Sequence, residues 1–187
     1  SIGVQAVMRS DPDGYTIVIS EIGATAVAPA LMPKLSFDVA RDFVGISQLI
    51  ENPGERQKLI DHPALIPTAV EEIVRHVSPV LNFARTATQD TELRGRKIHK
   101  GEKVLLMYPS ANRDADVFTD PDAFKVDRDP NPHVAFGIGN HFCLGANLAR
   151  MEIRVVLEEV LTRLPDMEYS EGPPSMHPSL LVRSFTR

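Results

Sequence analysis

Cys143 is the only cysteine among the 187 residues of the chain, and it lies in the glycine-rich stretch FGIGNHFCLG at residues 136–145. A single cysteine excludes an internal disulfide and a cysteine-rich zinc site. Gly137, Gly139 and Gly145 flank the thiol, and glycine lets the backbone adopt conformations closed to other residues and approach a flat ligand closely. A long helical pattern follows, and the positive end of a helix dipole favours the thiolate, the form that binds metals. The stretch therefore predicts one sulfur ligand that faces a large planar partner.

The spacing around Cys143 decides between such a ligand and the commoner alternative, a small buried hydrophobe. The pattern F-G-x-G-x-H-x-C-x-G fixes six residues within ten positions, which is far more specific than an isolated G-x-G. This stretch closely resembles the haem-binding loop of the cytochrome P-450 family. The resemblance implies heme b as the cofactor, Cys143 as the axial thiolate of its iron, and Phe136 packed against the cysteine to tune the sulfur. A thiolate ligand favours cleavage of the O–O bond.

Glu72 and Arg75 form an E-x-x-R motif inside a predicted amphipathic helix at residues 66–77, which has a proline near its start. Residues three apart share one face of a helix and can pair, although most such pairs are solvated surface bridges. In the P-450 family this pair is buried and a second arginine completes it, so the resemblance implies a structural ion-pair network. Arg128 is the candidate for the second arginine, because Ala123 occupies the position where the more familiar family form has one.

Two further side chains match family positions that bind the haem propionates. Arg85 lies in an extended-looking run at residues 81–87, after a proline that ends the preceding helix. His141 lies two residues before Cys143. Propionates are anionic and need charged or strong donor partners in a partly buried site, so the resemblance implies that Arg85 and His141 hold them. An ordinary exposed strand arginine is the alternative for Arg85.

The order of the motifs predicts a mixed α+β, mainly α fold that corresponds to the C-terminal part of the cytochrome P-450 fold. After the E-x-x-R helix come a buried strand at residues 103–107, an irregular meander at about 118–133 and the cysteine loop. A helical pattern from residue 144 to about 164 is apolar on more than one face, which predicts a core helix behind the haem. The resemblance covers residues 49–187 and does not include the helix that activates oxygen in the family. No residue is therefore assigned to proton delivery.

Residues 1–48 predict a small α/β fragment of different origin. The turn signal Pro12-Asp13-Gly14 precedes a β-rich run at residues 15–20, and a loop of small residues and a helical segment follow. This pattern resembles periplasmic solute receptors of the tripartite tricarboxylate transporter type, in which the loop after the strand helps to bind a carboxylate. We therefore expect two regions, a receptor-like fragment at 1–48 and a haem-binding region at 49–187, joined by gene rearrangement or faulty gene assembly.

The overall composition, 43% hydrophobic and 24% charged, is that of a globular protein. A formal net charge of −5 argues against a nucleic-acid partner. The sequence contains neither a run of about eighteen apolar residues nor a basic segment before an apolar core. We therefore expect no membrane span, no signal peptide and a cytoplasmic location.

The family resemblance implies a haem-thiolate monooxygenase, or its C-terminal fragment, that inserts one oxygen atom from O2 into a small organic substrate. A ferredoxin or a flavoprotein reductase would supply the electrons. The stretch at residues 83–95 and a late predicted strand at 179–185 resemble family members that hydroxylate sterols or branched lipids. Two alternatives stay open: a catalytically inactive haem-binding remnant in a fused or misassembled chain, and a carboxylate solute-binding module.

Overall fold

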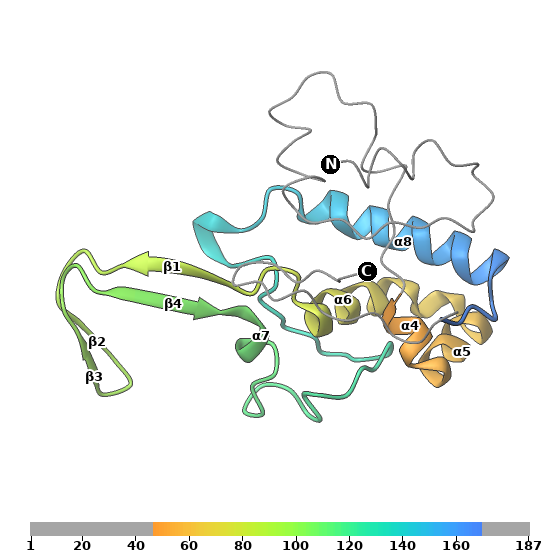
Figure 1. Ribbon diagram of the computed structural model, residues 1–187, viewed down its shortest axis with the longest axis horizontal. Coiled ribbons are helices and arrows are strands. Elements are labelled where there is room, and N and C mark those ends of the chain that lie inside the picture. The colour runs from red at the N-terminus through yellow and green to blue at the C-terminus, as the bar shows by residue number, and fades with distance from the viewer. Residues whose placement is uncertain (1–46, 170–187) are drawn as a thin grey trace, which may run out of the picture.

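Helices dominate the computed structural model, which describes residues 47–169 (Figure 1). The helices are α4 (Ser47–Glu51), α5 (Pro53–Asp61), α6 (Ile66–Val77), α7 (Tyr108–Ala111) and α8 (Ala146–Arg163), with 3-10 turns at Pro63–Leu65 and Gly139–His141. The strands are β1 (Asn82–Thr86), β2 (Thr91–Leu93), β3 (Arg96–Ile98) and β4 (Lys103–Met107). Within the described residues β1 pairs with β4 and β2 with β3, both antiparallel. The predicted mixed α+β, mainly α class is confirmed.

The hydrophobic core lies where α6 packs against α5 and α8 (Figure 1). α6 forms at the predicted residues because Pro67 suits a first helical turn and apolar residues recur every three to four positions. Its buried Val70 and Ile73 cluster with Leu157 and Leu161 of α8. Burial of each such side chain stabilises the fold by about 1.5–3 kcal/mol. This seam fixes the position of the helix that carries the E-x-x-R motif.

A buried cap ends α6. Ser78 adopts a left-handed φ of 44°, and its N–H donates to the carbonyl oxygen of Val74 at 3.0 Å. The Ser78 hydroxyl donates to the carbonyl oxygen of Arg75 at 2.7 Å and accepts a hydrogen bond from Nδ2 of Asn112 at 2.8 Å. The cap therefore ties the end of α6 to the residue that follows α7.

The ribbon formed by β1 and β4 projects from the helices (Figure 1). Arg85 of β1 faces Val104 of β4, and beyond the strands the N–H of Ala87 donates to the carbonyl oxygen of Glu102 at 3.0 Å. The strand predicted at residues 103–107 is confirmed, but its predicted burial is wrong, since Leu105 is 54% exposed. A continuous apolar run is typical of a buried strand, whereas this ribbon extends away from the helical core.

α8 confirms the predicted long helix, and one of its faces lies in the core. A second apolar stripe on α8, made of Leu148, Met151 and Val155, is about half exposed at 49%, 55% and 51%. α5 and α6 both pack against α8 from the same side (Figure 1). The prediction that more than one face of α8 is buried is therefore confirmed for one face only. The other apolar face, called the open face of α8 below, is about half exposed.

Residues 112–138 contain no helix or strand, so the meander predicted at about 118–133 is irregular as expected but extends beyond those bounds at both ends. Three apolar side chains nevertheless anchor this segment in the protein interior: Phe118, Phe124 and Val126. The N–H of Val126 also donates to the carboxylate of Glu55 on α5 at 2.8 Å. The segment predicted at 1–48 lies outside the described residues except for the start of α4, and the strand predicted at 179–185 lies outside them entirely.

Candidate functional site

The cysteine loop, defined as residues 136–145, folds back on itself. The N–H of Cys143 donates to the carbonyl oxygen of Phe136 at 2.9 Å, and the N–H of Phe142 donates to that of Gly139 at 3.0 Å. These two bonds close the loop just before α8 begins. The loop brings together six residues that the sequence singled out: Phe136, Gly137, Gly139, His141, Cys143 and Gly145.

The three glycines of the loop serve different purposes. Gly137 and Gly139 have φ angles of +71° and +64°, in the left-handed region that favours glycine. Gly145 has φ of −84°, which any residue adopts, so the conformational argument does not apply to it. A Cβ at position 145 would instead lie 3.9 Å from Sγ of Cys143. The absence of a side chain there leaves one flank of the sulfur open.

Gly137 and Gly139 provide a matched pair for testing how rigid the loop must be. A Cβ at Gly137 would lie 3.3 Å from the carbonyl oxygen of His141, whereas a Cβ at Gly139 meets nothing within 4 Å. We expect Gly139→Ala to lower the free energy of unfolding by about 1–2 kcal/mol, the cost of a left-handed alanine, and Gly137→Ala to lower it further. Urea unfolding followed by circular dichroism measures both, and equal losses would contradict the steric argument.

The Cys143 thiol is exposed, which excludes the alternative of a small buried hydrophobe. The apolar residues next to it in the chain are exposed as well, Phe142 at 51% and Leu144 fully. With helical spacing, Leu148 and Met151 then continue this surface along the open face of α8. An exposed thiol amid exposed apolar side chains is typical of a binding surface rather than of ordinary protein exterior.

Arg85 and His141 are both exposed, in β1 and in the turn before Cys143. Nη1 of Arg85 donates to the carbonyl oxygen of the preceding residue at 3.2 Å. Among residues 47–169 no carboxylate lies within ion-pair distance of either side chain. Tyr108 lies between β1 and the cysteine loop. Its ring packs edge to face on the ring of Phe83, in β1, with centroids 6.1 Å apart. The Tyr108 hydroxyl lies 3.9 Å from the place of a Cβ at Gly137.

The E-x-x-R pair is fully buried and forms a two-pronged ion pair. Nε and Nη2 of Arg75 donate to the two carboxylate oxygens of Glu72 at 2.7 and 2.8 Å. Nε of Arg128 donates to the same carboxylate at 3.0 Å. Both guanidinium groups also donate to the carbonyl oxygen of Ala123, at 3.0 and 2.9 Å. Ala123, at the position where the more familiar family form has an arginine, thus contributes its backbone carbonyl oxygen to the ion-pair network.

Sequence reasoning did not identify two further partners of Glu72. The backbone N–H of Lys125 donates to its carboxylate at 2.9 Å, and Nδ2 of Asn131 does so at 3.1 Å. Arg75 in turn donates to the carbonyl oxygens of Asn112 and Pro121 at 2.7 and 2.8 Å. Because these partners belong to the meander, the network attaches that segment to α6. No periodic pattern in the sequence could have indicated them.

The pKa of Glu72 predicts how stability depends on pH. Burial alone raises this pKa, but the hydrogen bonds from Arg75 and from the N–H of Lys125 outweigh burial and lower it below 4.5. The folded state therefore releases this proton more readily than the unfolded state, so the stabilisation is present above about pH 4.5 and is lost as the pH falls through the folded pKa. We expect the free energy of unfolding, measured by urea titration at a series of pH values, to fall on acidification.

Glu72→Gln provides the comparison for this pH profile. The variant should show a shallower decline at acidic pH, because the group that takes up the proton is gone. Some decline should persist, since hydrogen bonds from Arg150 and His133 outweigh the effect of burial and lower the pKa of Glu71 as well. A wild-type profile that stays level between neutral and acidic pH would contradict the assignment of a lowered pKa to Glu72.

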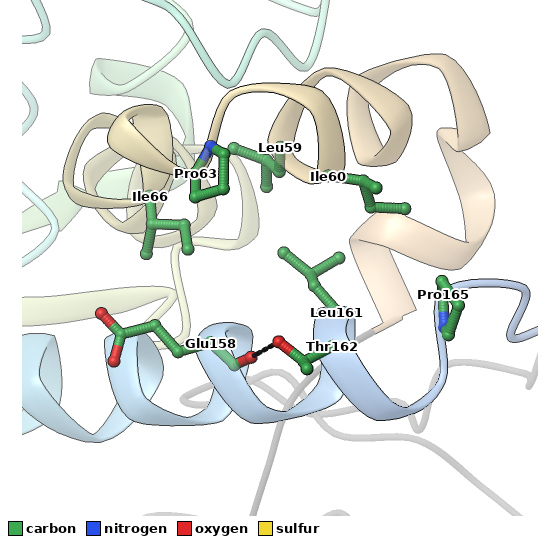
Figure 2. Close-up of a pocket in the computed structure, with 8 residues that line it drawn as sticks. All are labelled: Leu59, Ile60, Pro63, Ile66, Glu158, Leu161, Thr162 and Pro165. Carbon is green, nitrogen blue, oxygen red and sulfur yellow. Dashed lines mark hydrogen bonds between the residues drawn. The ribbon is translucent and has the colours of Figure 1, made fainter.

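A groove of about 420 Å³ between α5, α6 and α8 is separate from this site (Figure 2). Its lining includes Leu59, Ile66 and Leu161, and none of its lining residues belongs to the cysteine loop. Within residues 47–169 no three histidine, cysteine or acidic side chains form a metal-binding cluster, and no helix there is long and apolar enough to cross a membrane. In the part of the chain that the structure describes, Cys143 therefore belongs to no three-residue set of such ligands.

Comparison with known proteins gives long matches. The chain is 53% identical over 172 residues to a methyl-branched lipid omega-hydroxylase of Mycobacterium tuberculosis, covering 90% of this chain and 40% of that protein. It is 48% identical over 130 residues to a steroid C26-monooxygenase of Mycolicibacterium smegmatis, covering 70% of this chain and 32% of that protein. The chain thus spans about a third to two fifths of the length of these relatives. A match over 90% of the chain extends into residues 1–48, and no match supports the resemblance of that segment to transporter receptors.

Solved structures agree with the sequence comparison. The crystal structure of CYP109E1 from Bacillus megaterium in complex with corticosterone superposes with a TM-score of 0.72 at 40% identity, covering 75% of this chain and 38% of that one. The family model described as Cytochrome P450 matches residues 46–184. That family implies a haem–iron cofactor with a cysteine thiolate ligand. On these matches, the chain belongs to the cytochrome P450 family.

Proposed function

We propose that this chain is the haem-thiolate region of a monooxygenase that inserts one atom of O2 into an organic substrate. The observation that carries the proposal is the exposed Cys143 thiol, held in a closed loop and surrounded by exposed apolar side chains. A haem is a flat apolar ring with an iron centre and two anionic propionates, and these residues fit each of its parts. When bound through a thiolate, a haem supplies the chemistry of oxygen activation.

In this proposal the chain's own residues have distinct tasks. Cys143 would supply the thiolate ligand of the iron, and the left-handed Gly137 and Gly139 would hold the backbone of the cysteine loop in the conformation that presents the thiol. The exposed Phe142, Leu144 and open face of α8 would offer apolar surface to the ring and help to exclude water from the sulfur. The exposed side chains of Arg85 and His141 are free of carboxylate partners among residues 47–169, and they would be the donors to the propionates.

The ion-pair network holds the meander rather than the haem itself. Glu72 is buried and accepts hydrogen bonds from Arg75 and Arg128. The N–H of Val134, next to the cysteine loop, donates to the side-chain oxygen of the buried Asn112 at 2.8 Å. Asn112 also accepts a hydrogen bond from Arg75 through its carbonyl oxygen at 2.7 Å. The network therefore fixes the position from which the chain enters the cysteine loop.

We assign a sterol-like or branched-lipid substrate. Two relatives support this class by name, the steroid C26-monooxygenase and the methyl-branched lipid omega-hydroxylase. The β1–β4 ribbon offers exposed apolar side chains that suit such a substrate, with Phe83 facing Leu106 in the register. The proposal includes a ferredoxin or flavoprotein as electron donor and a cytoplasmic location, and it takes residues 49–187 as the haem-binding region.

Reconstitution of the purified chain with haem tests the proposal. We expect the ferrous carbon monoxide complex to show a thiolate-type Soret band. Turnover is then assayed with a surrogate ferredoxin and its reductase, with a steroid, a methyl-branched fatty acid and a straight-chain sugar alcohol as the unmatched control. Absence of a thiolate-type band would contradict the proposal. A thiolate-type band without turnover would instead favour the alternative of an inactive haem-binding chain.

A further inference from the structure

A second ionic cluster, formed by Glu71, His133 and Arg150, contacts the cysteine loop at Phe136 and takes no part in the proposed haem contacts. Nε and Nη2 of Arg150, on α8, donate to the two carboxylate oxygens of Glu71, on α6, at 2.6 and 2.9 Å. His133, whose side chain is 3% exposed, lies with Nε2 3.0 Å from the same carboxylate. Three segments that are far apart in the sequence thus meet at Glu71.

The histidine of this cluster is neutral. Nδ1 of His133 accepts a hydrogen bond from the N–H of Ala135 at 3.3 Å, so its proton resides on Nε2 and is donated to Glu71. Burial is the main cause that lowers the pKa of His133. The cluster therefore contains one negative charge, on Glu71, and one positive charge, on Arg150. Two opposite charges form a dipole whose orientation is fixed by the two-pronged contact.

The positive end of this dipole is directed at the cysteine loop. The guanidinium carbon of Arg150 lies 4.7 Å from the ring centroid of Phe136, which is cation–π distance. The carbonyl oxygen of Phe136 accepts the hydrogen bond from the N–H of Cys143, so the stacked residue is the one that closes the loop. The hydrogen bond to Glu71 is the main cause that raises the pKa of Arg150.

We propose that Arg150 is a positioning residue for Cys143, and that the Glu71–Arg150 dipole sets the electrostatic potential at the thiolate and hence the reduction potential of the bound haem. The guanidinium is held by Glu71 and lies over the ring of Phe136, so it keeps a positive charge next to the cysteine loop. This inference rests on the proposed function, in which Cys143 ligates the haem iron. It concerns a separate group, since neither Arg150 nor Glu71 contacts the haem in that proposal.

The direction in which the reduction potential changes distinguishes an electrostatic effect of Arg150 from a purely structural one. A positive charge near the haem favours the reduced state, which carries one more electron. Arg150→Met removes that charge and should lower the reduction potential, whereas Glu71→Gln removes the opposing negative charge and should raise it. A unit charge acting over a separation on the order of 10 Å at an effective dielectric constant of about 20 changes an equilibrium constant on the order of tenfold. Each variant should therefore shift the reduction potential by ~59 mV for a one-electron couple.

Two further variants complete the set. Arg150→Lys keeps the charge but loses the planar fork and its stacking, so it should retain the reduction potential while lowering the free energy of unfolding. Arg154 lies one turn further along α8, pairs with Glu158 at 2.7 Å and is 59% exposed. Arg154→Met therefore removes the same charge from the same helix without touching Phe136, and its potential should stay at the wild-type value.

Spectroelectrochemical titration of the haem-loaded wild-type and variant chains measures these potentials, and the ferrous carbon monoxide spectrum of each variant shows whether the thiolate ligand is retained. Opposite shifts for Arg150→Met and Glu71→Gln support the inference. Shifts of the same sign, or none, overturn it while leaving the proposed function intact. If Arg150→Met does not fold, the Glu71→Gln variant decides the question. A reduction potential of that variant at or below the wild-type value would overturn the inference and leave the proposed function intact. Failure of the wild-type chain to give a thiolate-type spectrum overturns the proposed function and this inference together.

Discussion

Replacing Cys143 by serine is expected to abolish the thiolate-type Soret band of the ferrous carbon monoxide complex completely. A serine hydroxyl stays protonated at neutral pH and cannot supply the charged sulfur that the proposed iron ligation needs. The change should leave the fold almost unaffected, because the thiol is exposed and an exposed substitution of this kind changes the free energy of unfolding by no more than about 0.5 kcal/mol. Absorption spectra and urea unfolding of the same preparations measure the two effects.

The chain offers an independent control for this experiment, since Cys143 is its only cysteine. Alkylation of the haem-free wild-type protein with iodoacetamide can modify no other thiol, so it should reproduce the spectral loss of the serine variant. The serine variant itself should be unaffected by the reagent. A thiolate-type spectrum that survives in the variant would exclude Cys143 as the axial ligand and remove the basis of the proposed function.

The cysteine loop and the E-x-x-R helix could be predicted because their determinants are local in the sequence. Glu72 and Arg75 share a face of α6 through helical spacing alone. The two left-handed angles at Gly137 and Gly139 are of the kind that glycine admits. The burial of this ion pair is a different matter, because it depends on carbonyl groups of the meander about 37 to 48 residues away from Arg75. That burial followed from family resemblance and not from the residues themselves.

Glu71 shows why the second cluster escaped prediction. Two adjacent glutamates look equivalent in the sequence, yet successive residues of a helix point about 100° apart. Glu72 consequently faces the meander, whereas Glu71 faces Arg150 on α8. The partner of Glu71 lies 79 positions further along the chain. Only the packing of α6 on α8 brings Glu71 to its arginine.

For the open face of α8, the sequence predicts burial that the structure does not show. An apolar pattern on more than one face predicts burial all round the helix, but the core contains only the face with Leu157 and Leu161. Met151 and Val155 lie on the other side and are about half exposed. Sequence pattern indicates that a face needs an apolar partner but not which partner it has. In the proposed function the N-terminal part of this face meets the haem.

Replacing Arg75 by alanine is expected to lower the stability of the fold more than any other substitution proposed above. The substitution removes both hydrogen bonds to Glu72 and those to the carbonyl oxygens of Asn112, Pro121 and Ala123. It leaves a buried carboxylate short of its main partner, a situation that costs about 3–5 kcal/mol. Folded domains have a total stability of about 5–15 kcal/mol, so a large part of it should disappear. Urea unfolding followed by circular dichroism measures the loss.

Arg154→Ala supplies the reference for that loss. Its ion pair with Glu158 has the same N···O distance as the pair of Arg75 with Glu72, 2.7 Å in both cases, but it is exposed. An exposed pair of this kind contributes about 0.3–0.5 kcal/mol on a helix. Because the shortest N···O distance is the same, the difference between the two variants reports burial, the second contact of Arg75 with Glu72 and the lost carbonyl contacts. Similar losses for Arg75→Ala and Arg154→Ala would show that Arg128 and Asn131 suffice to hold Glu72, and that the meander does not depend on Arg75.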